Sequence, residues 1–265
     1  IERVVSYQQI KFGKPSIPKI MEYYNLKKAN KFIENYETNN SLEFENKIIL
    51  KNISFSYKNE KNIFKDLNLE IPKNKIIGIV GESGSGKSTI VNLLTGLIKS
   101  QKGNIIIDEK EINDSLNLRR YQNLFSITSQ DTYLIDGSIK DNIIFRSKEK
   151  ISEDRIKSSI KFARPDTTIH DLPDGMDTYV GSNIKQLSSG QKQRISIARS
   201  IYSDREILIF DEATNALDKE NEKYIFENLK KLKAKKTIII ISHDPDNLKI
   251  CDYILRVENK NLVSN

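Results

Sequence analysis

One segment constrains the fold of this chain more than any other. Residues 81–89 read GESGSGKST, and they lie between an apolar run at residues 75–80 and an apolar helical pattern at residues 90–97. Glycines let a turn curl so that successive backbone N–H groups converge on one point, and a helix that starts there adds the positive end of its dipole. The pattern therefore predicts a buried strand, a phosphate-binding loop and a helix.

Each part of this loop has an expected task in holding a nucleotide. We expect the backbone to wrap the β-phosphate, Lys87 to neutralise the β and γ oxygens, and Thr89 to donate to the α-phosphate. Ser88 offers a hydroxyl to Mg²⁺, so it is also a candidate metal ligand. The candidate nucleotide-binding residues of the loop are Gly81, Glu82, Ser83, Gly84, Ser85, Gly86, Lys87, Ser88 and Thr89.

A second apolar run, at residues 207–210, ends in the adjacent carboxylates Asp211 and Glu212. The carboxyl end of a parallel strand lies beside the phosphate-binding loop, and neighbouring side chains of a strand point in different directions. We expect Asp211 to hold Mg²⁺ and Glu212 to take a proton from the attacking water. At this point the sequence predicts a P-loop ATPase or GTPase.

The remaining pattern adds strands and helices around this core. An apolar strand at residues 237–241 follows a helical stretch at residues 219–232, which gives the strand, helix, strand order of a parallel sheet. The further elements that the pattern predicts are an antiparallel β region at residues 48–57 and 64–71, a strand at residues 124–128 and helix over residues 138–163.

Composition excludes several other classes of protein. The 265 residues with 37% hydrophobic content can bury a core, and the net charge of +7 is spread along the chain, so it does not indicate nucleic-acid binding. The single cysteine, Cys251, excludes an internal disulfide, and we interpret it as a packed thiol. No run approaches the ~18 apolar residues of a membrane-spanning helix, so we expect the chain as given to be soluble.

A short segment before the Asp211 strand narrows the class. Residues 187–191 read LSSGQ, which closely resembles the LSGGQ signature of ABC ATPases, and the resemblance covers about residues 47–258. It implies a P-loop core with a parallel sheet, an antiparallel β-subdomain and an α-helical subdomain. It also implies that a second copy of the domain receives the signature at its γ-phosphate, so that a head-to-tail homodimer buries two ATP molecules. The signature residues that would contact this nucleotide are Ser188, Ser189, Gly190 and Gln191.

Four further positions match the family's pattern. The resemblance implies that Tyr57 stacks on adenine, that His243 senses the γ-phosphate, and that Gln130 contacts Mg²⁺ and faces a transmembrane partner. Asp218 belongs to the loop that couples the two ATP sites. ATP and Mg²⁺ are therefore the expected cofactors, and the expected catalytic residues are Glu212, His243 and Lys87.

The sequence also departs from the family's pattern at a few positions. Ser189 stands where a glycine is usual, and Asn215 stands where the family more often has serine. Ser182 and Asn183 occupy a region in which exporters usually carry a glutamate that contacts the transmembrane domain. His170 matches no motif, and we expect it on the surface.

The resemblance points to an exporter rather than an importer. Residues 130–144 resemble the exporter version of that region, and residues 1–44 resemble the tail of a last transmembrane helix that leads into its ATPase. We expect residues 1–44 to form a leader, residues 45–265 to form the nucleotide-binding domain and residues about 133–188 to form its helical subdomain. Such a half-transporter would work at the cytoplasmic face of the cell (inner) membrane, with a transmembrane domain of the same transporter and without nucleic acid.

Two alternatives and the cargo stay open at this stage. A soluble ABC ATPase acting on nucleic acid or ribosomes usually carries a long coiled coil or a second ATPase domain, and this sequence has neither. A regulatory domain that binds ATP without turnover would not need Glu212. The sequence of the leader and of residues 131–143 weakly resembles that of flippases for lipid-linked oligosaccharides. Lipid, peptide and drug exporters remain alternatives.

Overall fold

The computed structural model describes residues 42–57, 63–145, 151–164, 169, 172, 174–181, 187–258 and 261–264. These residues belong to one compact unit, Leu42–Asn265. The expectations for residues 1–41, His170, Ser182 and Asn183 lie outside the described residues.

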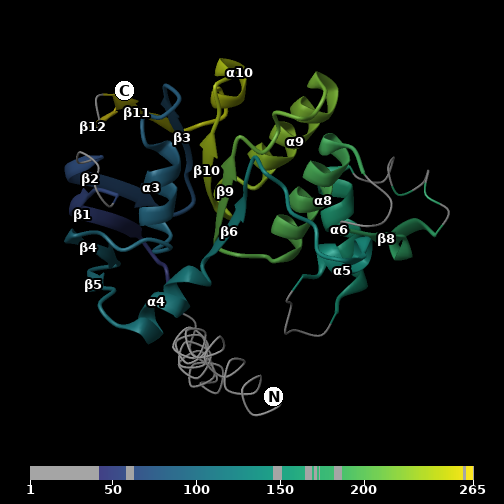
Figure 1. Ribbon diagram of the computed structural model, residues 1–265, viewed down its shortest axis with the longest axis horizontal. Helices are drawn as coiled ribbons and strands as arrows, with labels where there is room; N and C mark the ends of the chain where they lie inside the picture. Colours follow the sequence, from purple (N-terminus) through teal and green to yellow (C-terminus); the bar gives the residue numbers. More distant parts are fainter. Residues whose placement is uncertain are drawn as a thin grey trace, which may run out of the picture. The chain divides into compact units, whose positions relative to one another are not determined.

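A six-stranded sheet forms the centre of the unit, with strand order β12-β11-β3-β10-β9-β6 (Figure 1). All neighbouring strands run parallel except β11 and β12, which are antiparallel. The strands expected from the four apolar runs are confirmed, whereas the two C-terminal strands were not predicted. The bounds are β3 Ile76–Gly81, β6 Phe125–Thr128, β9 Ile207–Asp211, β10 Thr237–Ile241, β11 Tyr253–Glu258 and β12 Asn261–Ser264.

A second, four-stranded sheet has the order β2-β1-β4-β5 and is antiparallel throughout. The antiparallel region expected from the two N-terminal β-like runs is therefore confirmed, and these runs pair with each other directly. The bounds are β1 Lys47–Phe55, β2 Phe64–Pro72, β4 Lys102–Ile107 and β5 Lys110–Glu111.

The helices differ from the sequence prediction in several places, since α4 and α10 were not predicted and one predicted stretch is divided. Residues 138–163 do not form one helical stretch: α5 ends at Ile143, and α6 starts anew at Glu153, where the Ser152 side chain accepts a hydrogen bond from the backbone N–H of Arg155. The bounds are α3 Lys87–Leu94, α4 Ser115–Gln122, α5 Ile139–Ile143, α6 Glu153–Ala163, α8 Ser189–Tyr202, α9 Lys219–Lys231 and α10 Pro245–Leu248. A short 3-10 helix, Gly175–Asp177, and the paired strands β7 Gly137–Ser138 and β8 Tyr179–Val180 complete the described elements.

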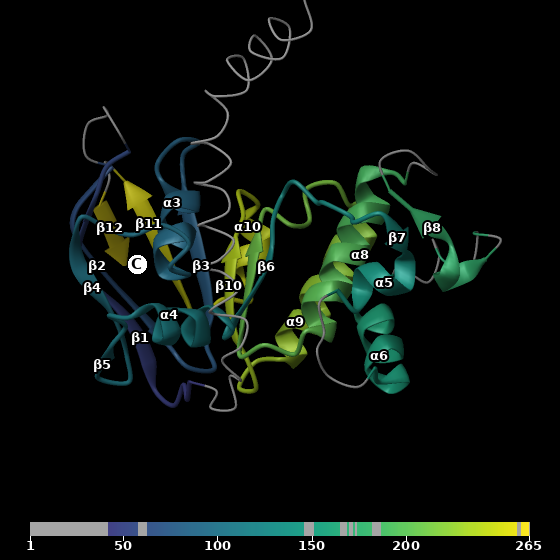
Figure 2. The same ribbon diagram turned by 60° about the horizontal axis from the view of Figure 1, so that its bottom comes forward.

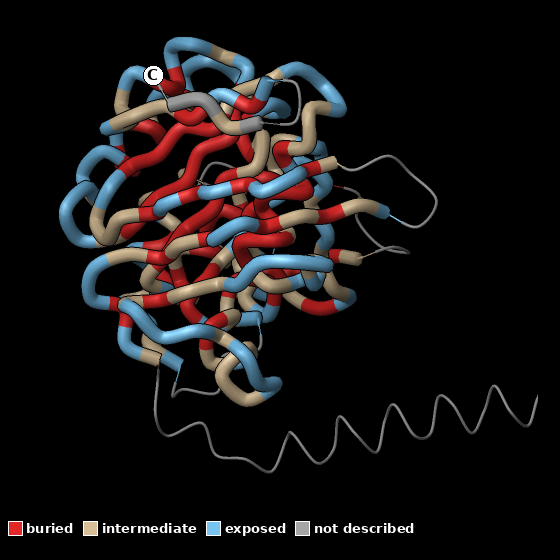
Figure 3. Tube along the Cα trace, turned by 90° about the vertical axis from the view of Figure 1, so that its left-hand side faces the viewer, coloured by how far each residue is buried: buried red, intermediate tan, exposed pale blue. Residues whose placement is uncertain are grey.

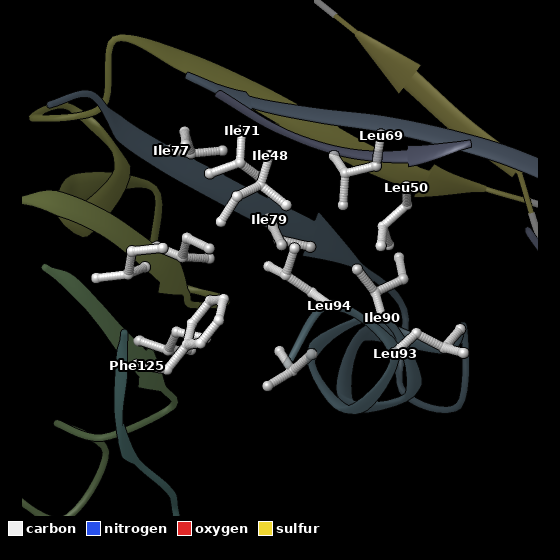
Figure 4. Packing of buried hydrophobic residues seen from close by; sticks show 14 of the residues in the cluster. Ile48, Leu50, Leu69, Ile71, Ile77, Ile79, Ile90, Leu93, Leu94 and Phe125 are labelled. Atoms are coloured by element: carbon white, nitrogen blue, oxygen red, sulfur yellow. The ribbon is translucent and has the colours of Figure 1, made fainter. Parts of the chain in front are cut away.

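Two hydrophobic cores cover the two faces of the central sheet. Alternate residues of each central strand enter different cores: Ile77 and Ile79 pack with α3 and the antiparallel sheet (Figure 4), whereas Ile76 packs with residues of α6, α8 and α9. Figure 3 shows this buried interior beneath exposed loops. Burial on both faces explains why these strands read as continuous apolar runs.

The parallel register brings three functional segments to one edge of the sheet. Ile241 at the end of β10 is paired with Asp211 of β9 on one side and with Ile79 of β3 on the other. The residues that follow these strands therefore start close together, which is where open α/β sheets bind ligands. Within the described residues, no helix has both the length and the apolar character needed to cross a bilayer.

Candidate active site

The phosphate-binding loop joins β3 to α3 through backbone geometry that requires glycine. Gly86, the residue before α3, has φ 107°, in the left-handed region, and a Cβ there would lie 2.7 Å from Phe64 Cζ. No side chain caps the start of α3. The first N–H groups of this helix therefore face the loop without a side-chain acceptor, as an anion site requires.

Lys87 holds its cation inside this loop. The side chain is buried, and Nζ donates to the carbonyl oxygens of Gly81 and Glu82, each at 2.9 Å. Both acceptors are neutral, so these contacts position the ammonium group without cancelling its charge. The arrangement places a desolvated positive charge where the loop converges.

A cleft of about 770 Å³ opens over the loop. Its lining consists of Tyr57, Ile63, Ser83, Gly84, Ser85, Gly86, Lys87, Ser88, Thr89, Gln130, Glu212 and His243. The structure thus gathers residues from five separate sequence segments in one cavity. Gly81 and Glu82 are not part of the lining and contribute their carbonyl oxygens to Lys87 instead.

Asp211 lies beside the loop in a partly buried position. Burial and the neighbouring charge of Glu212 raise the pKa of the Asp211 carboxyl, while Lys87 and a hydrogen bond from the Ser88 side chain oppose this rise. A carboxylate and a hydroxyl in contact are the hard oxygen donors that Mg²⁺ prefers. No group of three or more His, Cys, Asp or Glu residues could hold a metal ion within the described residues, so Mg²⁺ here would need further oxygens, such as those of phosphates.

Glu212 is held by donors on both carboxylate oxygens. Its Oε1 lies 2.8 Å from His243 Nε2, and its Oε2 accepts a hydrogen bond from Asn215 Nδ2 at 3.0 Å. The residue has φ 50°, in the left-handed region, and its N–H donates to the carbonyl of Ile241 at 3.0 Å. A non-glycine residue in this conformation costs about 1 kcal/mol, and such strain clusters at functional sites.

Tyr57 stands at the rim of the cleft with 42% of its surface exposed. The rings of Phe55 and Tyr57 form a T-shaped pair, with centroids 4.9 Å apart and an interplanar angle of 85°. Because so much of the Tyr57 ring is exposed at the cleft, a planar base has room to stack on it.

The signature segment forms a well-capped helix start. Ser188 caps α8: its Oγ accepts from the N–H of Gln191 at 3.2 Å, and Gln191 Oε1 accepts from the N–H of Ser188 at 2.9 Å. Gly190 lies so close to residues 215–218 that a Cβ would come within 2.8 Å of the Ala216 carbonyl oxygen. Ser189 is exposed, so the extra side chain at this position meets solvent in the single chain.

The structure does not bring the signature segment to the cleft. None of Ser188, Ser189, Gly190, Gln191 and Asp218 lines it. Helices α3 and α8 pack into different cores and lie on different sides of β10 in Figures 1 and 2. Asp218 instead caps α9 by accepting from the N–H of Asn221 at 2.9 Å, and these hydrogen bonds lower its pKa.

Two residues of the site were not foreseen in these positions. Ile63 lines the cleft, and its only signal in the sequence is an apolar side chain directly before a β-like run. Asn215 was noticed as a departure from the family's pattern, but its hydrogen bond to Glu212 depends on the left-handed turn at Glu212, which the sequence does not reveal.

The chain matches a family model and is similar to several known proteins. A family model described as ABC transporter matches residues 64–215. The chain is 41% identical over 224 residues to the ATP-dependent permease MDL1 of Candida albicans, covering 83% of this chain and 32% of that protein. It is 38% identical over 220 residues to the ATP-dependent lipid A-core flippase of Desulfotalea psychrophila (strain LSv54 / DSM 12343), covering 83% and 38%.

A solved structure of a bacterial Atm1-family ABC exporter with ATP bound matches with a TM-score of 0.77 and 31% identity. The match covers 84% of this chain and 39% of that chain. This chain therefore spans about two fifths or less of the length of the proteins that it matches.

Proposed function

Because this chain belongs to the ABC transporter family, we propose that it is the ATP-hydrolysing part of a membrane exporter that works as a dimer. The observation that carries this proposal is the convergence of the phosphate-binding loop, Glu212 and His243 on one cleft. A regulatory domain that only binds ATP would not need a carboxylate fixed beside the phosphate-binding loop.

The geometry supports hydrolysis by in-line attack of water on the γ-phosphorus. The loop and Lys87 hold the phosphates, and Tyr57 stacks on the base. Glu212 accepts a proton from the attacking water, while the bond from the γ-phosphorus to the bridging oxygen breaks and ADP and phosphate form. His243 keeps the carboxylate in position and reaches toward the γ-phosphate. Ser88, Asp211 and Gln130 would hold Mg²⁺, which spreads the charge of the phosphate oxygens.

A second copy of the domain completes the proposed site. The start of α8 has the chemistry of an anion site but lies outside the cleft of its own chain. In a head-to-tail dimer, Ser188, Gly190 and Gln191 of one copy would face the γ-phosphate held by the other. Ser189 and Asp218 would lie at the same interface. ATP bound between the two copies would stabilise the dimer.

We place this domain at the cytoplasmic face of a membrane, attached to a transmembrane domain of the same transporter. In this proposal residues 1–44 are the leader from that domain, residues 45–265 the nucleotide-binding domain and residues about 133–188 its helical subdomain. Closure on ATP and reopening after hydrolysis would bias the membrane part toward one orientation. The similar proteins with named activities are a permease and flippases, which favours this proposal over an ATPase acting on nucleic acid.

The first experiment removes the proposed base. Glu212→Gln keeps the shape of the side chain, so we expect it to bind ATP but to lower the steady-state ATPase rate of the purified chain by about 100-fold or more. Glu227→Gln, the same change on an exposed position of α9, is the control. An unchanged rate in Glu212→Gln would rule out the catalytic assignment.

The second experiment tests the dimer. The Glu212→Gln chain, mixed with ATP and Mg²⁺, should shift toward the dimer in sedimentation velocity, and EDTA should reverse the shift. A strict monomer at high protein concentration, with ATP bound, would count against the head-to-tail arrangement.

A further inference from the structure

A nearly buried carboxylate on α9 lies outside the nucleotide cleft but is hydrogen-bonded to segments that follow Glu212 and His243 in the sequence. Glu222 is 7% exposed and is not among the residues that line the cleft. A buried charge is costly unless it is paired and hydrogen-bonded. Its partners therefore show what this charge holds in place.

The first partner belongs to the segment that follows the catalytic carboxylate. Thr214 Oγ1 donates to Glu222 Oε1 at 2.9 Å, and both side chains are buried. Thr214 stands between Glu212 and Asn215, the residue whose amide donates to Glu212 Oε2. Glu222 thus fixes the turn from which the catalytic carboxylate projects.

The other partners are Asn247, four residues after His243, and Lys219, which lies on α9 itself. Asn247 Nδ2 donates both to Glu222 Oε1 at 2.8 Å and to Ser242 Oγ at 3.2 Å. Lys219 Nζ donates to Glu222 Oε2 at 2.9 Å and also contacts the Asp244 carboxylate. Ser242 and Asp244 are the residues directly before and after His243.

We infer that Glu222 is a positioning residue for ATP hydrolysis, which holds Glu212 and His243 at the separation that the reaction needs. Glu222 bonds directly to Thr214, two residues after Glu212. Through Asn247 and Lys219 it is linked to the residues on both sides of His243. The 2.8 Å distance between Glu212 Oε1 and His243 Nε2 therefore depends on a third residue that touches neither. This inference rests on the proposed role of Glu212 in hydrolysis.

Stability alone does not account for such a network. A buried ion pair can often be replaced by apolar groups of similar volume without loss of stability, because desolvation offsets the attraction between the charges. Here the carboxylate accepts from Thr214 and Asn247, which follow two different strands, β9 and β10, and from Lys219 on its own helix. A geometric role explains this choice of partners.

The test is a double-mutant cycle between Glu222 and His243. We expect Glu222→Gln to lower kcat for ATP by about 10-fold or more, because the amide no longer accepts from Lys219, while the Kd for ATP changes less than about 2-fold. In the His243→Ala background the same change should lower kcat by less than about 3-fold, because the pair that Glu222 positions is already broken. Glu227→Gln, on the exposed side of the same helix, is the matched control.

Four outcomes would contradict the inference or the function on which it rests. A Glu222→Gln chain with an unchanged kcat, or with an equal fold-loss in both backgrounds, would overturn the positioning role. If Glu222→Gln does not fold by circular dichroism, Asn247→Ala removes the link to Ser242 and must give the same dependence on His243, and an equal loss in both backgrounds again overturns the inference. A wild-type chain without ATPase activity would instead refute the proposed function and leave no reaction for Glu222 to assist.

Discussion

Two helices of this domain begin at segments rich in glycine and serine, yet their starts are built in opposite ways. Helix α3 follows a glycine in the left-handed region and has no side-chain cap, whereas α8 starts with a reciprocal Ser188 and Gln191 capping box. Lys87, Asp211 and Glu212 surround the start of α3. The start of α8 instead packs against the backbone of Ala216.

The difference teaches what each helix start can do within one chain. At α3 the free N–H groups, the buried cation and the carboxylates together can bind a nucleotide and activate water. At α8 the cap satisfies part of the helix terminus, and the remaining dipole can stabilise an anion only if another molecule brings one. The phosphate-binding loop therefore binds the nucleotide of its own chain. The signature segment can complete a site only on a second copy.

The largest expected effect comes from removing the cation at α3. Lys87→Ala should lower the ATPase rate by about 100-fold or more and also weaken ATP binding, because the phosphates lose their main counter-charge. Binding is measured by equilibrium dialysis with ATP and turnover by phosphate release. Retained ATP affinity in Lys87→Ala would contradict the assignment of the cleft.

A smaller effect, of a different kind, is expected at α8. Gly190→Ala places a Cβ 2.8 Å from the Ala216 carbonyl oxygen, so the helix start must shift away from residues 215–218. We expect turnover to fall by about 10-fold while ATP binding to the single chain stays unchanged, because Gly190 does not line the cleft. A parallel loss of ATP binding would mean that the two helix starts already act together within one chain.

Mixing these two variants tests the comparison directly. In a head-to-tail dimer of Lys87→Ala with Gly190→Ala, one of the two sites combines an intact loop with an intact signature segment. If the two sites work independently, an equal mixture should recover about a quarter of the wild-type rate, because half of the dimers are mixed and half of their sites are complete. A rate no higher than the mean of the separate variants would refute shared sites.

The sequence predicted some parts of the site better than others. Strand β3, the loop and the strand that ends at Asp211 were predictable, because apolar runs and glycine spacing encode them locally. The hydrogen bonds of Glu212 were not, because they depend on a left-handed turn and on the register of β9 against β10. The prediction of one helical stretch over residues 138–163 was wrong, because a new helix starts after Ser152.

The catalytic side should also carry a cost in stability that the signature side does not. Burial and the charge of Glu212 raise the pKa of Asp211, so the charged form destabilises the folded chain above that pKa, and the penalty disappears as the pH falls toward the unfolded value of about 3.9. Asp211→Asn should therefore raise the melting temperature of the nucleotide-free chain at pH 7, and the gain should shrink at acidic pH. Asp131→Asn, at an exposed position, is the control, and a lower melting temperature for Asp211→Asn would contradict the argument.

The smallest effect is expected at the position where the signature segment departs from its family. Ser189 is exposed in the single chain and is the first residue of α8, so Ser189→Gly removes an exposed side chain. Glycine near a helix start costs at most about 1 kcal/mol, and we expect the ATPase rate to change by less than about 3-fold. Gly190→Ala adds one carbon at the neighbouring residue, so the two variants compare an exposed position with one that lies against backbone. If Ser189→Gly changes the rate as strongly as Gly190→Ala does, the extra hydroxyl acts on the nucleotide of the second copy. Serine at this position then sets the rate of hydrolysis.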